Sequence, residues 1–428
     1  MKIVMFTNTY LPHVGGVARS VSTYENEFRR RGHDVRIVAP EFEGGAESNE
    51  YVLRTPALQR FNGSDFSVTI PQPGLIAEFL DDFRPDVIHS HHPFLLGDAA
   101  LRAAWTRNRP LVFTHHTLYE QYTRYVPMDS EALQRVAIQM ATEYCNLCTH
   151  VIAPSRSIAD LLLQRKVTTP ISAIPTGIDL ETFGNGDGRR FRSRFKIPHD
   201  ALVVGHVGRL AAEKNLDFLS RALGLFLEKQ PEAILVVVGT GDYEDALVET
   251  VGQRARPERI IMAGSQMGQN LVDAYTAMDV FAFSSQSETQ GMVLAEAMAA
   301  RTPVVALDGP GVRDVLGESN GRLLPGNAAE EEFADVLADL TQDRRALRAL
   351  GESARASVRE VGLDVCADQM LALYQKLTDE YGDGPDADPG PWDRLLARLE
   401  IEWNLFVEKT SALTAAVVET DATRTQLD

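Results

Sequence analysis

Residues 201–210 read ALVVGHVGRL, an apolar run that ends in Gly-Arg-Leu, and four comparable runs follow it. These are AILVVVGTG (233–241), RIIMAGS (259–265), MDVFAFSS (278–285) and TPVVALD (302–308). Each run has the length of a buried strand, and helical stretches lie between them. Alternating strands and helices of this kind predict an α/β fold with a parallel, doubly wound sheet.

The same pattern occurs earlier in the chain. Its strand candidates are KIVMF (2–6), DVRIVAP (34–40), PDVIHS (85–90), PLVFTH (110–115), THVIAPS (149–155) and ISAIPT (171–176). A Gly-rich stretch near 184–189 separates the two sets. We therefore predict two Rossmann-like domains that face each other across a cleft.

The predicted boundaries follow from these patterns. The first domain takes residues 1–185 and is completed by a helix at about 364–382, and the second takes 186–363. Residues 383–391 are rich in Asp, Gly and Pro, so they are expected to form a linker. Residues 392–428 are expected to form a helical tail that docks on the body, pairs with another subunit or lies on a membrane.

The composition of the chain limits the classes of partner that we expect. The chain has 428 residues and a net charge of -18, which argues against a nucleic-acid partner. Residues 1–170 carry 17 Lys+Arg against 18 Asp+Glu, so the first half can approach an anionic membrane more easily than the acidic remainder. The chain has no long apolar run and no signal-peptide pattern, so we expect a cytoplasmic protein, with peripheral contact at the inner membrane face as an alternative.

The segment SETQGMVLAEAMA (287–299) carries the strongest chemical signal. Glu288 follows a predicted strand, and Glu296 lies eight residues later in the helix that begins near Gly291. The first backbone N–H groups of that helix form a natural site for an anion such as a diphosphate. Carboxylates on both sides of it can accept hydrogen bonds from sugar and ribose hydroxyls.

The segment VGRLAAEKN (207–215) carries two cations, Arg209 and Lys214, on the loop after another predicted strand. Breaking a sugar–diphosphate bond leaves negative charge on phosphate oxygens, and fixed cations lower that barrier without a metal. A third, weaker signal is Gly15-Gly16 at the start of the first helix, because glycines let the backbone approach a ligand closely.

Histidines cluster in HSHHPF (89–94) and FTHHT (113–117), which both follow strands of the first domain. Their spacing does not match a zinc motif, so we expect hydrogen-bonding groups that line a cleft and no metal site. Cys145 and Cys148 form a C-x-x-C pair without a second pair at zinc spacing, and we expect buried structural thiols.

Together these segments closely resemble glycosyltransferase family 4, which contains retaining enzymes of the GT-B fold. The resemblance covers about residues 1–380 and rests on seven segments in order: NTYLPHVGGV, VIHSHHPF, FTHHT, THVIAPS, IPTGID, VGRLAAEKN and SETQGMVLAEAMA. It implies transfer of a hexose from a nucleoside-diphosphate sugar, with UDP-sugar favoured, to an acceptor hydroxyl. It also implies that the anomeric configuration is retained and that no metal or other cofactor takes part.

The resemblance implies a role for each matching residue. Arg209 and Lys214 would bind the diphosphate, Glu288 the transferred sugar, and Glu296 the ribose. His116 would bind the sugar and help to position the acceptor. The other residues expected at the donor are Gly16, which would approach the phosphate or the acceptor, Gly208, Gly264 near the base, Thr289, Gln290, Gly291 and Met292.

The segment THHTLYEQYTRYVP (114–127) looks like that of bacterial diacylglycerol glucosyltransferases, so a lipid acceptor is expected. On a helix, Tyr119, Tyr122 and Tyr125 would lie along one face. Such a stripe suits a lipid–water boundary or a sugar ring, and it equally suits packing into the core. The alternatives are a soluble sugar or small-molecule acceptor and a nucleotide-sugar epimerase. The tail is the expected site of any homo-oligomer contact.

Overall fold

The computed structural model describes residues 1–428 apart from 14, 43–44, 46–47, 59–67, 122–130 and 382–428. The chain divides into two compact units. The first unit comprises Met1–Ile174 and the described residues from Ala367 onward, and the second comprises Pro175–Cys366. The predicted linker and helical tail lie outside the described residues.

The described part of the first unit contains a seven-stranded parallel sheet in the order β3-β2-β1-β6-β7-β8-β9. A separate antiparallel pair is formed by β4 and β5. The bounds are β1 Lys2–Phe6, β2 Asp34–Pro40, β3 Val52–Thr55, β4 Ala57–Leu58, β5 Val68–Thr69, β6 Val87–Ser90, β7 Leu111–Thr114, β8 His150–Ala153 and β9 Ile171–Ala173.

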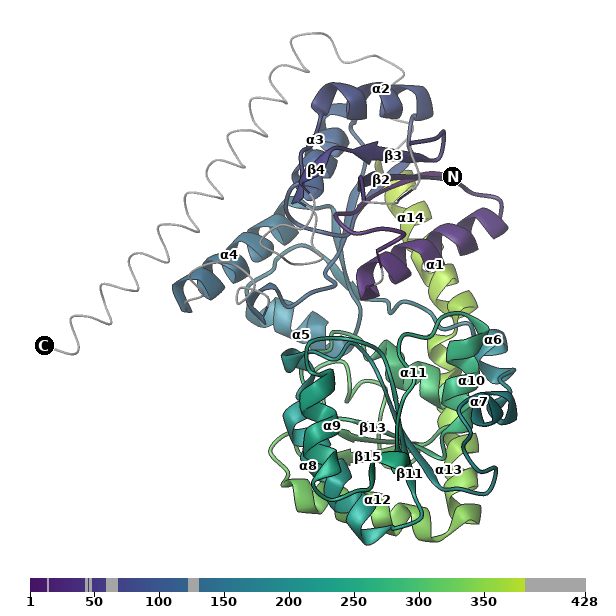
Figure 1. Cartoon of the computed structure of the whole chain (residues 1–428). Coiled ribbons are helices and arrows are strands. Elements are labelled where there is room, and N and C mark those ends of the chain that lie inside the picture. The colour runs from purple at the N-terminus through teal and green to yellow at the C-terminus, as the bar shows by residue number, and fades with distance from the viewer. Residues whose placement is uncertain (14, 43–44, 46–47, 59–67, 122–130, 382–428) are drawn as a thin grey trace, which may run out of the picture. The chain divides into compact units, whose positions relative to one another are not determined.

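Helices cover both faces of this sheet, as β1 illustrates. Its side chains alternate, so that Val4 and Phe6 join one apolar cluster while Ile3 and Met5 join another. The first cluster includes residues of α2, α3, α4 and α5, and the second includes residues of α1 and α14 (Figure 1). The bounds are α1 Gly16–Arg30, α2 Pro73–Phe83, α3 Leu96–Arg107, α4 Glu131–Leu147, α5 Arg156–Gln164 and α14 Leu363–Tyr381.

In the second unit, the described residues form a six-stranded parallel sheet in the order β12-β11-β10-β13-β14-β15. One face packs on α8, α9 and α12, and the other on α6, α7, α10, α11 and α13 (Figure 1). The strand bounds are β10 Val203–Val207, β11 Ile234–Val238, β12 Ile260–Met262, β13 Val280–Phe283, β14 Val304–Leu307 and β15 Gly321–Leu324. The helix bounds are α6 Leu180–Gly184, α7 Gly188–Arg194, α8 Leu216–Lys229, α9 Glu244–Gly252, α10 Gln269–Ala277, α11 Met292–Ala299, α12 Glu330–Gln342 and α13 Arg344–Ser357.

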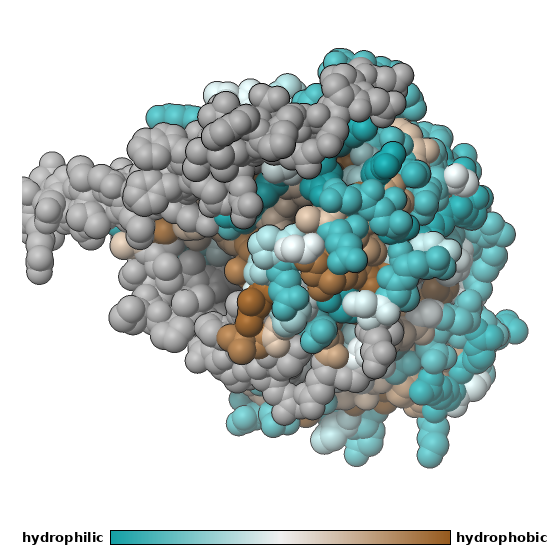
Figure 2. All heavy atoms as spheres, turned by 90° about the horizontal axis from the view of Figure 1, so that it is seen from above, coloured by the Kyte–Doolittle hydropathy of each residue, from teal (hydrophilic) through white to brown (hydrophobic). Residues whose placement is uncertain are grey.

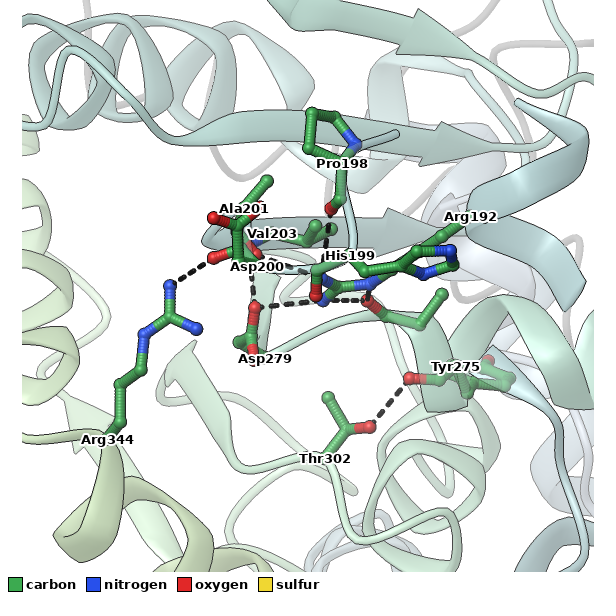
Figure 3. A network of polar contacts seen from close by, with 11 residues as sticks. Arg192, Pro198, His199, Asp200, Ala201, Val203, Tyr275, Asp279, Thr302 and Arg344 are labelled. Carbon is green, nitrogen blue, oxygen red and sulfur yellow. Dashed lines mark hydrogen bonds and ion pairs between the residues drawn. The ribbon is translucent and has the colours of Figure 1, made fainter. Parts of the chain in front are cut away.

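A buried arginine of α7 ties the helices of the second unit to its sheet (Figure 3). Arg192 donates to the carbonyl of Ala277 through Nε (3.0 Å) and Nη2 (2.7 Å), and to the carbonyl of Ala201 through Nη1 (2.9 Å). Its Nη2 also donates to Asp279, whose carboxylate accepts the N–H of Val203 at the start of β10. Arg192 therefore has a structural role.

Both sheets reverse their strand order next to their first strand, between β1 and β6 and between β10 and β13. Ligands of open α/β sheets bind beside the carboxyl ends of the strands at such a reversal. In the second unit these are the loops that carry Arg209, Lys214 and Glu288. The predicted class, an α/β chain with two doubly wound units, is confirmed.

Candidate active site

In the second unit, serine side chains hold the loop after β10 against the loop after β13. Ser284 Oγ donates to the carbonyl oxygens of Lys214 and Asn215, both at 3.0 Å. Ser287 Oγ donates to the carbonyl of Glu213 at 3.1 Å. These bonds position the short 3-10 turn Ala212–Lys214, so the two predicted motifs meet at one edge of the sheet.

Lys214 and Glu288 form an ion pair at this edge. Lys214 Nζ lies 2.5 Å from Glu288 Oε1, and each side chain is 18% exposed. The hydroxyl of Ser285 donates to the same oxygen at 2.9 Å. Burial by itself would raise the pKa of Glu288, but the charge and hydrogen bond of Lys214 outweigh it, so the pKa lies below its ordinary value. Glu288 is therefore a carboxylate that can accept hydrogen bonds.

Arg209 is the more exposed of the two predicted cations. Its guanidinium is ion-paired with Glu213, four residues later. The arginine side chain is 47% exposed, whereas that of Glu213 is 3% exposed. A buried carboxylate thus anchors a cation that stays accessible to solvent.

The N-terminus of α11 is held in place by its surroundings. Gly291 caps the helix with a φ of +71°, a left-handed conformation that favours glycine. Gln290 exchanges two hydrogen bonds with the backbone of Thr176, through Nε2 (2.6 Å) and Oε1 (2.9 Å). A Cβ on Gly311 would lie only 2.6 Å from the nitrogen of Gln290, so the chain between Thr289 and Met292 has little room to shift.

Glu296 takes a different position from Glu288. Its side chain is fully buried in α11, and Tyr275 donates a hydrogen bond to its Oε2 at 2.8 Å. This arrangement links α11 to α10. Ribose binding by Glu296 stays a prediction.

Three glycines bring together the loops after β10, β11 and β12. A Cβ on Gly239 would lie 1.8 Å from the carbonyl oxygen of Gly208, and the N–H of Gly239 donates to the carbonyl of Gly264. Gly264 has a φ of +65°. The loops that carry Gly208 and Gly264, two residues predicted at the donor, therefore both contact Gly239.

In the first unit, Gly16 is the first residue of α1, with no atom within 4 Å of the position of a Cβ.

In the first unit, Asn8 joins the loop after β1 to the loop after β6. Its side chain donates to the carbonyl of Phe94 (3.0 Å) and accepts the N–H of Leu96 (3.2 Å). Its own backbone N–H donates to His92 Nδ1 at 3.0 Å. Because that nitrogen accepts, neutral His92 carries its proton on Nε2.

The histidines after β6 and β7 hydrogen-bond to one another and to their neighbours. His89 lies between Tyr374 OH (2.5 Å from Nδ1) and Thr114 Oγ1 (2.7 Å from Nε2). His91 Nδ1 lies 2.9 Å from Nε2 of His116. Burial lowers the pKa of His89 to about 3 and holds the pKa values of His91 and His116 well below the ordinary value, so the rings are neutral near pH 7.

Within the part of the chain that the structure describes, no group of three His, Cys, Asp or Glu side chains is arranged to hold a metal ion. The neutral histidines act instead as hydrogen-bonding groups at the carboxyl ends of β6 and β7. Cys145 and Cys148 are buried free thiols, as the sequence indicated.

The predicted tyrosine stripe is described only at its first member. Tyr119 lies in a 3-10 turn, Tyr119–Gln121, and its ring meets those of Phe94 (5.4 Å between centroids) and His115 (5.6 Å) edge to face. Tyr122 and Tyr125 lie outside the described residues. Acceptor binding by these tyrosines stays a prediction.

Comparisons with known proteins match both units. The family model of Glycosyltransferase Family 4 matches residues 14–182, and that of Glycosyl transferases group 1 matches residues 187–357. An alpha-monoglucosyldiacylglycerol synthase from Streptococcus pneumoniae is 28% identical over 324 residues, which are 74% of each chain. A GDP-mannose-dependent alpha-mannosyltransferase from Mycobacterium tuberculosis is 29% identical over 383 residues, 88% of this chain and 96% of the relative.

Among solved structures, Anabaena HepE in complex with UDP-glucose superposes with a TM-score of 0.68 at 20% identity, covering 88% of this chain and 100% of that one. The chain belongs to glycosyltransferase family 4. It has the GT-B fold and is a glycosyltransferase.

Thr176, whose backbone is bound by Gln290, lies in IPTGID, one of the segments that carry the family resemblance.

His206 lies outside those segments, and the sequence analysis did not single it out. His206 lies in β10 and donates from Nδ1 to the carbonyl of Ala282 at 3.1 Å, which leaves Nε2 as a buried acceptor. A Cβ on Gly208 would lie 3.5 Å from that Nε2. The only signal was one polar residue inside the apolar run ALVVGHVGRL.

Among the described helices of this glycosyltransferase, none combines the length and the hydrophobicity needed to cross a membrane.

Proposed function

We propose that this glycosyltransferase moves a hexose from a nucleoside-diphosphate sugar to the hydroxyl group of a glycerolipid, with retention of the anomeric configuration. The observation that carries the proposal is the Lys214–Glu288 ion pair beside Arg209 at the strand reversal of the second unit. A diphosphate competes with Glu288 and Glu213 for the two cations. The carboxylate that is released can then accept hydrogen bonds from sugar hydroxyls.

The chemistry follows from where charge develops. The bond between the anomeric carbon and the phosphate oxygen breaks, and a bond forms between that carbon and the acceptor oxygen on the same face. The acceptor proton moves to the departing phosphate oxygen. Arg209, Lys214 and the N-terminus of α11 oppose the growing negative charge of the leaving group, and such electrostatic stabilisation usually contributes most to catalysis of this kind.

We propose that the reaction needs no metal ion or other cofactor. Two fixed cations and a helix N-terminus can together balance the charge of the diphosphate. The partly buried Ser285–Glu288–Lys214 contacts keep the lysine at the site before the donor arrives. A fixed dipole or charge acts without reorganising during the reaction.

The proposed donor is a UDP-sugar. The structural neighbour from Anabaena was solved with UDP-glucose, which supports this choice. The mycobacterial relative is described as GDP-mannose-dependent, so the guanine nucleotide is the competing donor.

The proposed acceptor is a lipid. The pneumococcal relative is described as a synthase of a glucosyldiacylglycerol, which supports it. The first unit also exposes apolar side chains on β4, after β5 and in the first turn of α2: Leu58 (56% exposed), Ile70 (49%) and Leu75 (39%). Hydrophobic surface is visible in the view from above (Figure 2). Exposed apolar groups of this kind favour contact with a membrane or a lipid.

A product assay tests the proposal. Purified protein is incubated with UDP-glucose or GDP-mannose and with diacylglycerol in mixed micelles or free glucose, each with and without excess EDTA. We expect an α-linked glucosyl lipid from UDP-glucose, in equal yield with the chelator. A soluble glycoside, a mannosyl product or a β-linkage would overturn the acceptor, donor or stereochemical part respectively. Conversion of the donor to an epimer without an acceptor would indicate the alternative reaction.

A further inference from the structure

His91 and His116 follow neighbouring strands, β6 and β7, whose carboxyl ends lie side by side. The rings are nearly parallel, at 19°, and their facing nitrogens are 2.9 Å apart. This is the distance of a hydrogen bond between two imidazoles. His91 is buried, with 1% of its surface exposed, whereas His116 is partly exposed.

Only one of the two facing nitrogens can carry the shared proton, since both rings are neutral. The other nitrogen of His91, Nε2, is buried and has no hydrogen-bond partner among the described residues. If His91 accepted at Nδ1, its proton would sit on Nε2 as an orphaned buried N–H. If His91 donates at Nδ1, Nε2 holds only a lone pair. Buried N–H groups without a partner are the rarer case in proteins.

The geometry points to His91 as a positioning residue that donates from Nδ1 to Nε2 of His116 and so places the proton of His116 on Nδ1. This inference rests on the proposed function and on the role that the family resemblance implies for His116, which is to help position the acceptor. His116 then binds a ligand oxygen by donating a hydrogen bond from Nδ1. Its basic nitrogen, Nε2, is occupied by His91, so His116 is not the base that removes the acceptor proton.

The proton balance of the transfer agrees with this assignment. The acceptor oxygen loses its proton to the leaving phosphate oxygen, and His116 begins and ends the reaction in the same neutral form. A donor at Nδ1 can hold a hydroxyl oxygen through one of its lone pairs and leave the other lone pair free to attack. His116 is thereby a binding group with a defined polarity.

The tautomer itself can be measured without any substrate. In protein labelled with 15N-histidine, long-range 1H–15N spectra separate protonated from unprotonated ring nitrogens, and a His116→Gln variant assigns the signals of His116. We expect a pyrrole-like Nδ1 and a pyridine-like Nε2 for His116, and the same pattern for His91. A protonated Nε2 on His116 would overturn the inference whatever the enzyme turns over.

Variants of His91 test the consequence for catalysis. The amide nitrogen of Asn can take the place of Nδ1, whereas the longer side chain of Gln reaches toward the place of Nε2. We therefore expect His91→Asn to keep most of the activity with UDP-glucose and short-chain diacylglycerol in micelles. His91→Gln and His91→Leu should lower kcat/KM for the acceptor by about tenfold, the effect of one lost hydrogen bond. The KM for UDP-glucose should not change.

His150→Leu is the matched control, because it removes another histidine of the first unit, one bonded to Ser172 at 2.9 Å. It should leave the kinetics unchanged. Equal losses for Asn, Gln and Leu at position 91 would overturn the positioning role. Full activity of His116→Ala would remove His116 from the proposed function, while the tautomer measurement would still decide the inference.

Discussion

Among single residues, Lys214 offers a test of the proposed diphosphate site. Its ammonium group lies 2.5 Å from Glu288, the carboxylate that a phosphate would displace. We expect Lys214→Ala to lower kcat with UDP-glucose by about 100- to 1000-fold, since one preorganised donor is worth about 2.7–4 kcal/mol in the transition state. Release of UDP in steady state measures the effect. Lys229→Ala is the control, because Lys229 pairs with Asp335 among exposed side chains of the same unit. Near-normal turnover of Lys214→Ala would contradict its place at the diphosphate.

At the scale of elements, the start of α11 depends on close packing between two loops. Gly311 has a φ of +71°, and a Cβ there would lie 2.6 Å from the nitrogen of Gln290. We expect Gly311→Ala to lower the free energy of unfolding by at least about 1–2 kcal/mol, the cost of a left-handed conformation with a side chain. It should also raise the KM for the donor, because the backbone before α11 must shift. Urea unfolding and donor kinetics measure both effects.

Gly317→Ala is the matched control for that variant. A Cβ on Gly317 meets no atom within 4 Å, so the substitution adds no contact. We expect it to leave the donor KM unchanged. A normal donor KM in Gly311→Ala, together with a loss of stability, would mean that the N-terminus of α11 does not bind the diphosphate.

The molecule as a whole contains several histidines that are neutral because they are buried. Burial lowers the pKa of His89 and His92 to about 3 and the pKa of His115 and His206 to about 4. In the unfolded chain these groups have a pKa near 6.5, so the unfolded state binds more protons below that pH. The contribution of these histidines to the free energy of unfolding is therefore fully present above pH 6.5 and falls as the pH drops toward 4.

We expect the free energy of unfolding to fall between pH 6.5 and 5 with a slope of up to about 1.36 kcal/mol per pH unit for each buried histidine. Urea titrations at several pH values measure the slope. His92→Asn can still accept the N–H of Asn8 but does not titrate, so its slope should be smaller. A flat profile in the wild-type protein would show that these histidines are not held neutral.

The hydrophobic pattern was enough to predict the class of fold and the loops on which the predicted site residues lie. Apolar runs such as 2–6 and 34–40 coincide with β1 and β2, because burial on both faces of a parallel sheet demands continuous apolar residues. Four short strands of the described residues escaped this prediction. An arginine lies in the short apolar runs of β3 (VLRT) and β15 (GRLL), and β4 and β5 are only two residues long. The placement of Arg209, Lys214 and Glu288 after strands also followed from the pattern alone.

Which atoms meet depends on how the chain folds in three dimensions. His91 and His116 are 25 residues apart, Gln290 and Thr176 are 114 apart, and Tyr374 and His89 are 285 apart. These pairs depend on strand order and on loop conformation, which hydrophobic periodicity does not encode. Glu288 and Glu296 have different surroundings for the same reason. The two carboxylates look equivalent in the sequence, but one turns to Lys214 at the sheet edge and the other to Tyr275 inside the core.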